Sequence, residues 1–354
     1  MILKYIIEKS LEERSLSKEE ILYLLKQKEE GQLNRIYEAA RQLRERYFGK
    51  EIFLYSFVYF STYCRNNCSF CYFRSSNNIP PRYRKSAEEI VETAKSLKNA
   101  GIHLIDLTMG EDPYFLKHPD RLADIIRKVK EETGLPVMIS PGVLSEEVID
   151  LLIQAGADWY ALYQETHNRE LFRRLRVGQD FQARLHAKEY AKKKGMLVEE
   201  GLLAGAGSRI EEYVESFQYM KKLGAAQVRT MTFIPQKGSP MEEWEQSTFT
   251  GELLNIAVMR LIFPKVLIPA SLDVDGLRGL KERLDAGANV VTSIIPPKKG
   301  YAGVANAEYD INDGHRTIDG IQETLHSCGL SAATAKDYKS WMNTYREVER
   351  GLPA

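Results

Sequence analysis

The strongest constraint on the fold is the regular alternation of short apolar runs with amphipathic stretches after residue 50. Eight runs have the composition of β-strands: residues 52–61, 103–110, 136–142, 159–166, 196–205, 227–235, 266–274 and 289–296. The segments between them, such as residues 86–101 and 145–157, place apolar residues at helical spacing. Strands that alternate with helices form parallel βαβ units, and eight such units favour a closed (β/α)₈ TIM barrel over an open sheet.

Glycines mark the expected ends of the helices, because a helix C-cap often requires a left-handed backbone. Those that precede a strand-like run are Gly101, Gly134, Gly156, Gly195, Gly224 and Gly287. The first fifty residues instead look helical, and Ser17 with Glu20 matches a capping box. We therefore expect an N-terminal helical extension in residues 1–50, a barrel in residues 51–328, and a C-terminal helical segment in residues 329–354 packed near the barrel.

Composition narrows the possible partners. The 49 basic and 49 acidic residues cancel, so no overall field attracts nucleic acid or an anionic membrane. The start of the chain lacks a signal-peptide pattern, and the longest apolar run, residues 52–60, is shorter than the roughly 20 residues that span a bilayer. Four cysteines do not make a secreted disulfide framework. We expect a cytoplasmic monomer with no nucleic-acid or membrane partner.

The C-terminal ends of the predicted strands are rich in polar residues and glycine, and active sites of TIM barrels lie at this end. An ordinary turn would account for many of these residues, because every strand must end in a loop. It does not account for charges inside the strands, namely Asp106, Arg229 and Asp273. The outer face of a barrel strand packs on helices, so these charges should face the barrel mouth or a buried partner.

Three cysteines lie within eight residues, whereas the fourth, Cys328, is distant. A zinc site should show a fourth ligand, and the nearest downstream histidine, His103, lies on another strand. A disulfide would leave an odd thiol, and buried structural cysteines would be unusual in a hydrophilic loop such as residues 65–69. The remaining reading is a [4Fe–4S] cluster held by Cys64, Cys68 and Cys71, which leaves one iron with an open position.

A small ligand with an amine and a carboxylate could chelate that open iron, and the methionyl end of S-adenosylmethionine (SAM) has both. The spacing Cys64-x₃-Cys68-x₂-Cys71, with Phe70 before the last cysteine, resembles the radical SAM signature. The resemblance implies a [4Fe–4S] cluster and SAM as cofactors, and an external one-electron reductant. It also implies that a 5′-deoxyadenosyl radical abstracts a substrate hydrogen, so that no side chain beyond the cofactors is catalytic.

Further stretches extend the resemblance to the SAM site. Gly110 and Glu111 match the end of the family's Gly–Gly–Glu motif, although Met109 replaces the first glycine. Glu165 matches an acid that binds the methionyl amine, and Arg184 an arginine that meets the methionyl carboxylate. The complete set that the resemblance implies is Phe70, Tyr72, Gly110, Glu111, Ser140 (ribose side), Glu165, Arg176 (a second carboxylate candidate), Arg184 and Ala204 (the adenine edge). The charged members could instead form ordinary surface salt bridges.

Within the radical SAM family, the chain resembles the subgroup that contains biotin synthase, a hydrogenase maturase and 3-methylornithine synthase. Biotin synthase needs cysteines for a second cluster, and only Cys328, which we interpret as a packing residue, remains. The resemblance to 3-methylornithine synthases covers nearly the whole chain. It implies an isomerase that converts L-lysine into (3R)-3-methyl-D-ornithine by hydrogen abstraction, fragmentation and recombination, the first step of pyrrolysine biosynthesis.

An amino-acid substrate with two ammonium groups needs one cation and several acceptors. Arg229 can form a bidentate pair with a carboxylate, and acids or hydroxyls can accept from ammonium groups. The predicted substrate residues are Asp106, Arg229, Ser271, Asp273, Thr292 and Ser293. A structural Arg–Asp network at the barrel mouth is the alternative.

Two other functions stay open on the sequence alone. One is a hydrogenase-maturase-like enzyme that acts on another small amino-acid-type substrate. The other is a non-enzymatic iron–sulfur or zinc-binding module. His103, His167 and His315 lack metal-ligand spacing, and we interpret them as structural or surface residues.

Overall fold

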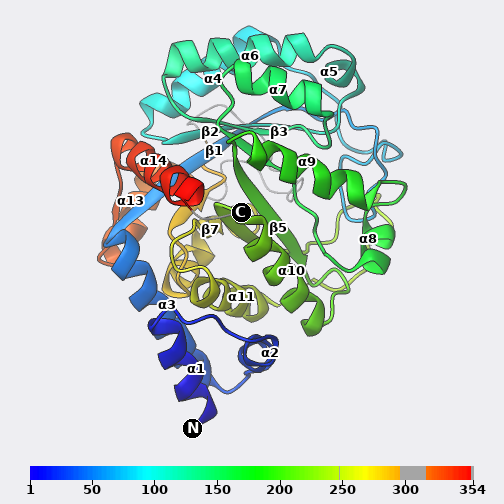
Figure 1. Cartoon of the computed structure of the whole chain (residues 1–354). Coiled ribbons are helices and arrows are strands. Elements are labelled where there is room, and N and C mark those ends of the chain that lie inside the picture. Colours follow the sequence, from blue (N-terminus) through cyan, green and yellow to red (C-terminus); the bar gives the residue numbers. More distant parts are fainter. Residues whose placement is uncertain (247, 296–315, 352–354) are drawn as a thin grey trace.

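The predicted strands form one parallel sheet that curves into an almost closed barrel (Figure 1). The structure is a computed structural model and describes residues 1–246, 248–295 and 316–351. Its strands are β1 (Glu51–Ser61), β2 (Leu104–Met109), β3 (Val137–Ser140), β4 (Trp159–Ala161), β5 (Leu197–Ala204), β6 (Gln227–Thr232), β7 (Pro269–Ser271), β8 (Val290–Thr292) and the short β9 (Ser331–Ala332) beside β1. They are ordered β6-β5-β4-β3-β2-β1-β8-β7, and one bridge, from Gln227 to Leu267, links β6 to the start of the β7 segment. The prediction of a (β/α)₈ barrel is confirmed.

Helices surround the barrel and follow the strands in the order that the sequence predicts (Figure 1). Those between the strands are α4 (Ala87–Asn99), α5 (Pro113–Lys117), α6 (Pro119–Thr133), α7 (Glu146–Gln154), α8 (Arg169–Leu175), α9 (Phe181–Lys193), α10 (Ile210–Leu223), α11 (Phe249–Ile262), the 3₁₀ turn η1 (Gly276–Gly279) and α12 (Leu280–Asp285). The flanking helices are α1 (Ile2–Leu11), α2 (Lys18–Leu25), α3 (Glu30–Phe48), α13 (Ile318–Ser327) and α14 (Ala335–Gly351).

Local signals set the helix ends. The predicted capping box before α2 is present, because the Glu20 backbone N–H donates to Ser17 Oγ over 3.2 Å and the Ser17 N–H donates to the Glu20 carboxylate over 2.6 Å. Ser86 and Glu89 form the same motif before α4. Gly134 ends α6 in the left-handed region with a φ of 63°, which a side chain would disfavour.

Three of the strands are much shorter than the runs that predict them, and the other strands after β1 are shorter by smaller amounts. β4, β7 and β8 contain three residues each. Glu165, four residues after β4, and Ser293, directly after β8, both have a φ of 68°. The long strand predictions at 159–166, 266–274 and 289–296 are therefore wrong in their ends, and Pro296 lies outside the described residues. These early strand ends matter for function, because they place polar side chains on bent segments at the barrel mouth.

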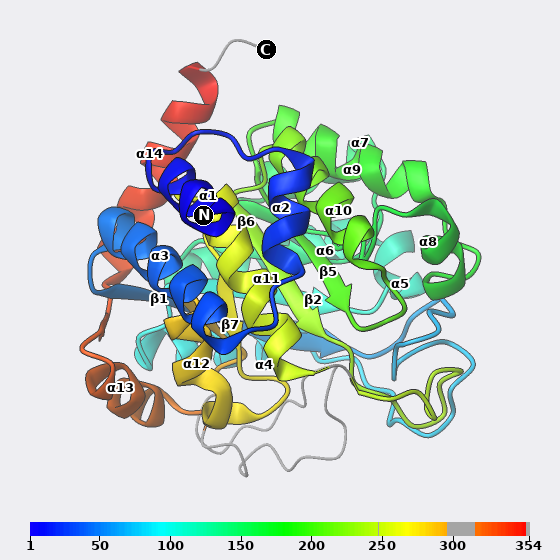
Figure 2. The same cartoon turned by 90° about the horizontal axis from the view of Figure 1, so that it is seen from below.

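The two flanking parts cover different sides of the barrel. α14 seals the floor, where Tyr338 packs edge-on against Phe53 with ring centroids 5.2 Å apart and Trp341 stacks on Trp159 at 6.1 Å. The N-terminal helices α1 to α3 instead pack on the outside of α11 and α12 (Figure 2). The mouth is left to the strand ends and the loops that follow them.

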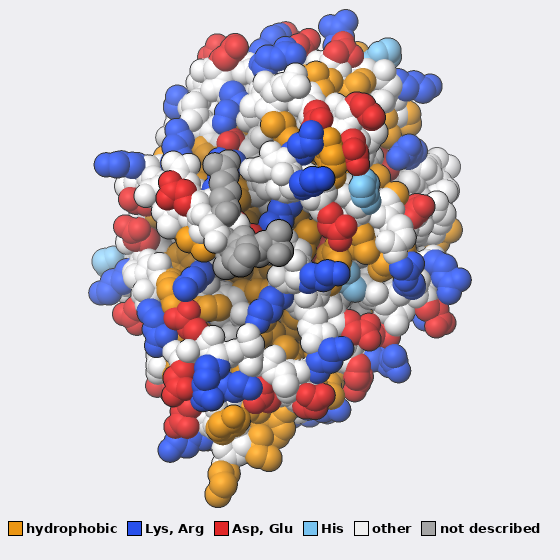
Figure 3. All heavy atoms as spheres, viewed as in Figure 1, with side chains coloured by type: hydrophobic (Ala, Val, Ile, Leu, Met, Phe, Trp, Pro, Cys, Tyr) orange, Lys and Arg blue, Asp and Glu red, His pale blue; other side chains and the backbone are white. Residues whose placement is uncertain are grey.

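The surface carries no large field of one sign on the face shown in Figure 3, where Lys and Arg side chains alternate with Asp and Glu. Exposed apolar side chains gather at the start of α1, at Met1, Ile2 and Tyr5. None of the helices in the described part of the chain combines the length and the apolar composition that crossing a membrane requires.

Candidate active site

The strand ends surround a cavity of about 290 Å³ at the C-terminal side of the barrel, where such folds place their active sites. Most of the predicted site residues line it: Cys64, Cys68, Phe70, Cys71, Asp106, Gly110, Glu111, Ser140, Glu165, Arg176, Arg184, Arg229 and Asp273. Residues from β2, β3 and β6 thus meet residues that are far away in the sequence. The cysteines lie on one side of this cavity and the predicted substrate residues lie deeper in the barrel.

The cysteines belong to a long segment that follows β1, here called the cysteine loop (residues 62–85). Backbone hydrogen bonds tie it to its neighbours, for example from Ser69 N–H to the Leu175 carbonyl at the end of α8, over 2.8 Å. Arg82 holds the loop from within by donating to four backbone carbonyls, those of Thr62, Phe73, Arg74 and Asn77. The sequence analysis did not single out Arg82.

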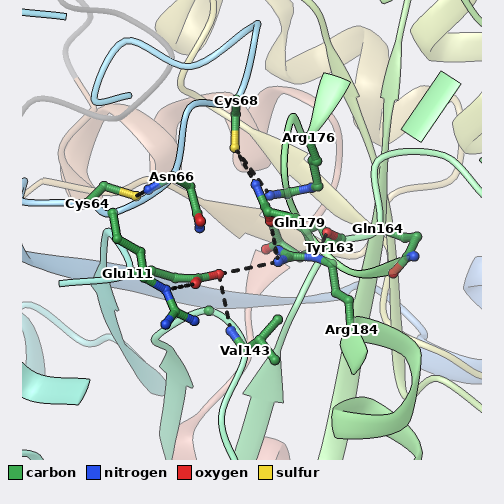
Figure 4. Close-up of polar contacts among 12 residues, drawn as sticks. Cys64, Asn66, Cys68, Glu111, Val143, Tyr163, Gln164, Arg176, Gln179 and Arg184 are labelled. Atoms are coloured by element: carbon green, nitrogen blue, oxygen red, sulfur yellow. Dashed lines mark hydrogen bonds and ion pairs between the residues drawn. The ribbon is translucent and has the colours of Figure 1, made fainter. Parts of the chain in front are cut away.

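Two donors from the turn that follows α8 point at one of the sulfurs (Figure 4). Gln179 Nε2 lies 3.0 Å from Cys68 Sγ, and Arg176 Nη1 lies 3.7 Å from it. Burial raises the pKa of both Cys64 and Cys71, so these thiols ionise only against a strong positive charge such as a bound metal cluster supplies.

Glu111 is enclosed at the cavity edge. Its carboxylate accepts from Arg65 Nε over 3.0 Å and from the Val143 backbone N–H over 3.2 Å, and Arg184 Nη1 lies 3.5 Å away (Figure 4). Gly142 leaves room for the Glu111 side chain, because a Cβ at position 142 would lie 1.9 Å from Glu111 Cγ.

Gly110, directly before this acid, is equally constrained. A Cβ at Gly110 would lie 2.3 Å from the Tyr63 carbonyl oxygen and 2.9 Å from Cys64 Cβ. The glycine therefore lets β2 approach the first cysteine. This geometry explains why a motif ending in Gly–Glu is useful here even though Met109 replaces its first glycine.

Glu165 lines the cavity, and one of its two carboxylate oxygens lacks a hydrogen-bond partner among the described residues. Arg176 donates to Oε1, whereas Oε2 is buried and has no hydrogen bond within the described structure. Burial raises the pKa of this carboxyl group, and the positive charge of Arg176 opposes that shift. A buried acceptor left open in this way suits an ammonium ligand.

These contacts test whether the implied cofactors fit the residues present. Three thiols, an open acid and two arginines line one cavity, which suits a cluster with an amine- and carboxylate-bearing ligand. Within the described ranges, no group of three or more His, Cys, Asp or Glu side chains is arranged to hold a single metal ion. The cluster-binding role of the cysteines therefore rests on their spacing and on the shared cavity, and stays a prediction.

Asp106 lies deeper in the barrel and connects two sets of predicted residues. Its carboxylate accepts from Ser140 Oγ over 2.8 Å, because Thr108 and Ser140 are paired residues on the adjacent strands β2 and β3. Burial raises the pKa of Asp106 to about 6, while the hydrogen bond from Ser140 opposes the shift. Ser140, which we predict to lie beside the ribose of SAM, therefore also hydrogen-bonds to the predicted substrate residue Asp106.

Arg229 is held by a partner that the sequence analysis did not name. Its Nε donates to Glu199 over 2.8 Å, Nη2 contacts Tyr55 Oη, and Tyr163 Oη donates to the same glutamate over 2.9 Å. Burial raises the pKa of Glu199 to about 8 and lowers that of Arg229 to about 10, so the guanidinium remains a cation at neutral pH. Glu199 and Tyr55 thereby orient the predicted carboxylate receptor.

Asp273 is the outermost of the predicted substrate acids. Ser271 Oγ lies 3.1 Å from its carboxylate, and Arg316 Nη1 lies 3.4 Å from it. Ser293 Oγ is 3.3 Å from Ser271 Oγ and 3.1 Å from Thr292 Oγ1, which extends this set of hydroxyl contacts. The three hydroxyls therefore form a chain of hydrogen-bond contacts that ends at the Asp273 carboxylate.

Five predicted site residues do not line the cavity: Tyr72, Ala204, Ser271, Thr292 and Ser293. Tyr72 packs beside Phe73, with ring centroids 5.4 Å apart. The carbonyl of Ala204 is engaged by the Phe233 N–H over 2.8 Å, so this part of the backbone edge is used by β6. Ligand contacts by these five residues stay predictions, and the hydroxyls of Ser271, Thr292 and Ser293 are linked to Asp273 by hydrogen bonds.

Two acids that the sequence analysis missed lie side by side in β5. Glu199 points to Arg229 inside the barrel, and Glu200 pairs with Lys188 on the opposite side of the strand. The sequence did contain a signal for these two acids. Charges inside predicted strands identified Asp106 and Arg229, and the same criterion would have identified Glu199 and Glu200.

The remaining singled-out residues lie outside the cavity lining. His103 accepts from the Leu54 N–H over 3.0 Å near the floor, and His167 lies against Tyr219 with ring centroids 4.3 Å apart. Cys328 is half-buried at the end of α13. His315 lies outside the described residues.

A barrel with three clustered cysteines at its mouth defines a class of enzyme, and the sequence matches that class. The Radical SAM superfamily matches residues 58–220. A curated relative, the [FeFe] hydrogenase maturase subunit HydE of Thermotoga maritima, is 32% identical over 81% of this chain and 82% of its own length.

Relatives with higher sequence identity show to which family within this class the chain belongs. The 3-methylornithine synthase of Methanosarcina acetivorans is 46% identical over 94% of this chain and 95% of that enzyme, and the Methanosarcina barkeri enzyme gives the same values. The crystal structure of methylornithine synthase (PylB) superposes with a TM-score of 0.91 at 45% identity, covering 95% of this chain and 99% of that one. The chain belongs to the 3-methylornithine synthase family of radical SAM enzymes.

Proposed function

We propose that this chain is a radical SAM mutase that converts L-lysine into (3R)-3-methyl-D-ornithine and acts as a monomer. The proposal is supported by the 46% identity to two enzymes named 3-methylornithine synthase. It is supported independently by the charges that line the deep end of the cavity.

The single observation that carries the proposal is that one guanidinium and two carboxylates line the same cavity. They belong to Arg229, Asp106 and Asp273. Lysine carries one carboxylate and two ammonium groups, so its charges complement these three side chains. Arg229 would receive the carboxylate, with Glu199 and Tyr55 fixing the plane of its guanidinium.

Apolar side chains form much of the wall between the two ends of the cavity. They are Tyr55, Phe57, Tyr59, Leu162, Leu203, Met231 and Phe233. A wall made largely of aromatic and aliphatic surface limits the access of water to a reactive fragment. It therefore suits a rearrangement whose pieces must stay together until they recombine.

At the other end, Cys64, Cys68 and Cys71 would hold the [4Fe–4S] cluster, and Glu165 would accept from the methionyl ammonium of SAM. Arg176 forms an ion pair with Glu165 and opposes the rise in its pKa that burial causes, and we assign Arg184, which lines the same cavity, to the methionyl carboxylate. When bound, these cofactors supply hydrogen-atom abstraction driven by one electron from an external reductant. The role of the protein is to bind, orient and shield.

The test is anaerobic incubation of reconstituted enzyme with ¹³C-labelled lysine, SAM and dithionite. Labelled methylornithine is the expected product, and Cys68→Ser should abolish it together with cluster iron. Formation of 5′-deoxyadenosine without methylornithine would refute the assigned substrate and favour a maturase-like enzyme with another amino-acid-type substrate. Retained iron without any SAM cleavage would favour a binding module.

A further inference from the structure

A buried ion pair lies on the outer side of β5 and does not line the cavity. Lys188 of α9 and Glu200 of β5 have fully buried side chains in direct contact. Burial alone would raise the pKa of Glu200, but Lys188 and His167 lower it overall, so the carboxyl group is ionised. Burying two charges costs desolvation energy, which makes a pair remote from the cavity worth explaining.

The pair is connected to one residue of the segment after β4. Glu200 Oε1 accepts the backbone N–H of Gln164 over 2.7 Å, and Lys188 Nζ donates to Gln164 Oε1 over 3.0 Å. The side-chain amide of Gln164 in turn donates to the Phe181 carbonyl over 3.3 Å. The backbone and the side chain of Gln164 are therefore both held from outside the barrel.

The next residue is Glu165, whose φ of 68° lies in a region that residues other than glycine rarely adopt. Its N–H donates to the Gly201 carbonyl over 3.1 Å, and its carbonyl accepts from Leu203 N–H over 3.0 Å. This backbone turn directs the carboxylate to Arg176 and leaves Oε2 open. A strained turn of this kind persists only if its surroundings fix it.

α9 contacts the segment at a second point. Arg184, one helical turn before Lys188, donates through Nε to the Tyr163 carbonyl over 2.8 Å. The two side chains thus hold residues 163 and 164 from the same helix face. The cofactor candidate Arg184 and the buried pair belong to one structural unit.

We propose that Glu200 and Lys188 are positioning residues for SAM: the Glu200 oxygen on the Gln164 N–H fixes the turn that aims Glu165 into the cavity. The inference rests on the proposed role of Glu165 as receptor of the methionyl ammonium. An alternative is that the pair only stabilises packing of α9 on β5. The two explanations differ in whether the acceptor oxygen at position 200 matters once both charges are gone.

Two double variants separate these explanations. Lys188→Met with Glu200→Gln removes both charges but keeps an oxygen that can accept the Gln164 N–H. Lys188→Met with Glu200→Leu removes the charges and the oxygen. Buried pairs are often replaceable by uncharged side chains of similar volume, so both proteins should fold. The Gln variant is the matched control.

The measurement is the SAM dissociation constant of reconstituted, unreduced protein under anaerobic conditions, which requires no turnover. We expect the Gln variant to bind within about threefold of the parent and the Leu variant to bind at least roughly tenfold more weakly, because a buried N–H is left unpaired. Amide hydrogen exchange without SAM should be faster over residues 162–168 in the Leu variant alone. Iron content should be equal.

Equal SAM affinity and equal exchange in the two variants would overturn the positioning role. If the Leu variant does not fold, Glu200→Asp takes its place, since it keeps the charge but withdraws the oxygen, and the same loss of affinity is expected. Glu165→Gln tests the underlying assignment separately: unchanged SAM affinity there would refute the role of Glu165, whereas the exchange data would still report on the turn.

Discussion

The pH dependence of lysine binding is the most direct test of the substrate end. Burial raises the pKa of Asp106 from 3.8 to about 6, and only the ionised carboxylate can pair with an ammonium group. Lysine affinity should therefore fall as the pH falls through about 6. At pH 5, one unit below that pKa, roughly one molecule in eleven is ionised, so the apparent Kd should be about tenfold higher than at neutral pH.

Groups that face Asp106 set the useful pH window. Tyr163 and Glu199 interact with it electrostatically. Glu199 has a pKa of about 8, so acidification below 8 protonates it and removes a negative charge that competes with the substrate carboxylate for Arg229, an effect of opposite sign. Between pH 7 and pH 5 Glu199 stays largely protonated, and the slope reports on Asp106.

The assay is equilibrium dialysis of radiolabelled lysine against reconstituted, unreduced enzyme with SAM, at intervals from pH 7 to pH 5. Asp106→Asn should bind lysine more weakly at pH 7 and show no slope. An unchanged parent affinity across this window, or the same slope in the Asn variant, would refute the reasoning. The pH dependence of stability has the opposite sign. Because the pKa of Asp106 is raised in the folded state, its contribution to the free energy of unfolding falls as the pH rises from about 4 to about 6.

Other substitutions test the remaining site. Cys68→Ser should prevent cluster assembly, measured as iron and sulfide per chain, whereas Cys328→Ser should leave both unchanged. Gly142→Ala should lower the Tm and weaken SAM binding, because the new Cβ would meet Glu111 Cγ at 1.9 Å; equal values in both measurements would contradict the close packing. Arg229→Lys keeps the charge but loses the bidentate fork, so the KM for lysine should rise roughly tenfold and more in Arg229→Met, at unchanged iron content. A kcat effect without a KM effect would argue against carboxylate binding.

Much of the architecture could be predicted because its signals are local. The alternation of strand-like and helical periods is read from neighbouring residues, and capping motifs such as that of Ser17 are complete within four positions. The three cysteines are also a local pattern. The charges inside the strands identified Asp106, Arg229 and Asp273 because a barrel strand offers only an inner and an outer face.

What could not be predicted depends on contacts between distant segments. The link between Ser140 and Asp106 follows from the register of β3 on β2, which the sequence of either strand does not contain. The turn at Glu165 depends on an oxygen from Glu200 in the next strand. The contact between the hydroxyls of Thr292 and Ser293 depends on the bend at Ser293 directly after β8, which the sequence does not reveal.

The contacts of Arg82 bear on how the enzyme would survive oxygen. One guanidinium ties together four carbonyls of the cysteine loop without using any of the three sulfurs. These four bonds fix part of the loop backbone through protein contacts, whereas small zinc domains unfold when the metal is removed. If the predicted cluster is lost to air, these bonds remain, so we expect rebuilding of the site to need iron and sulfide but no complete refolding of the loop.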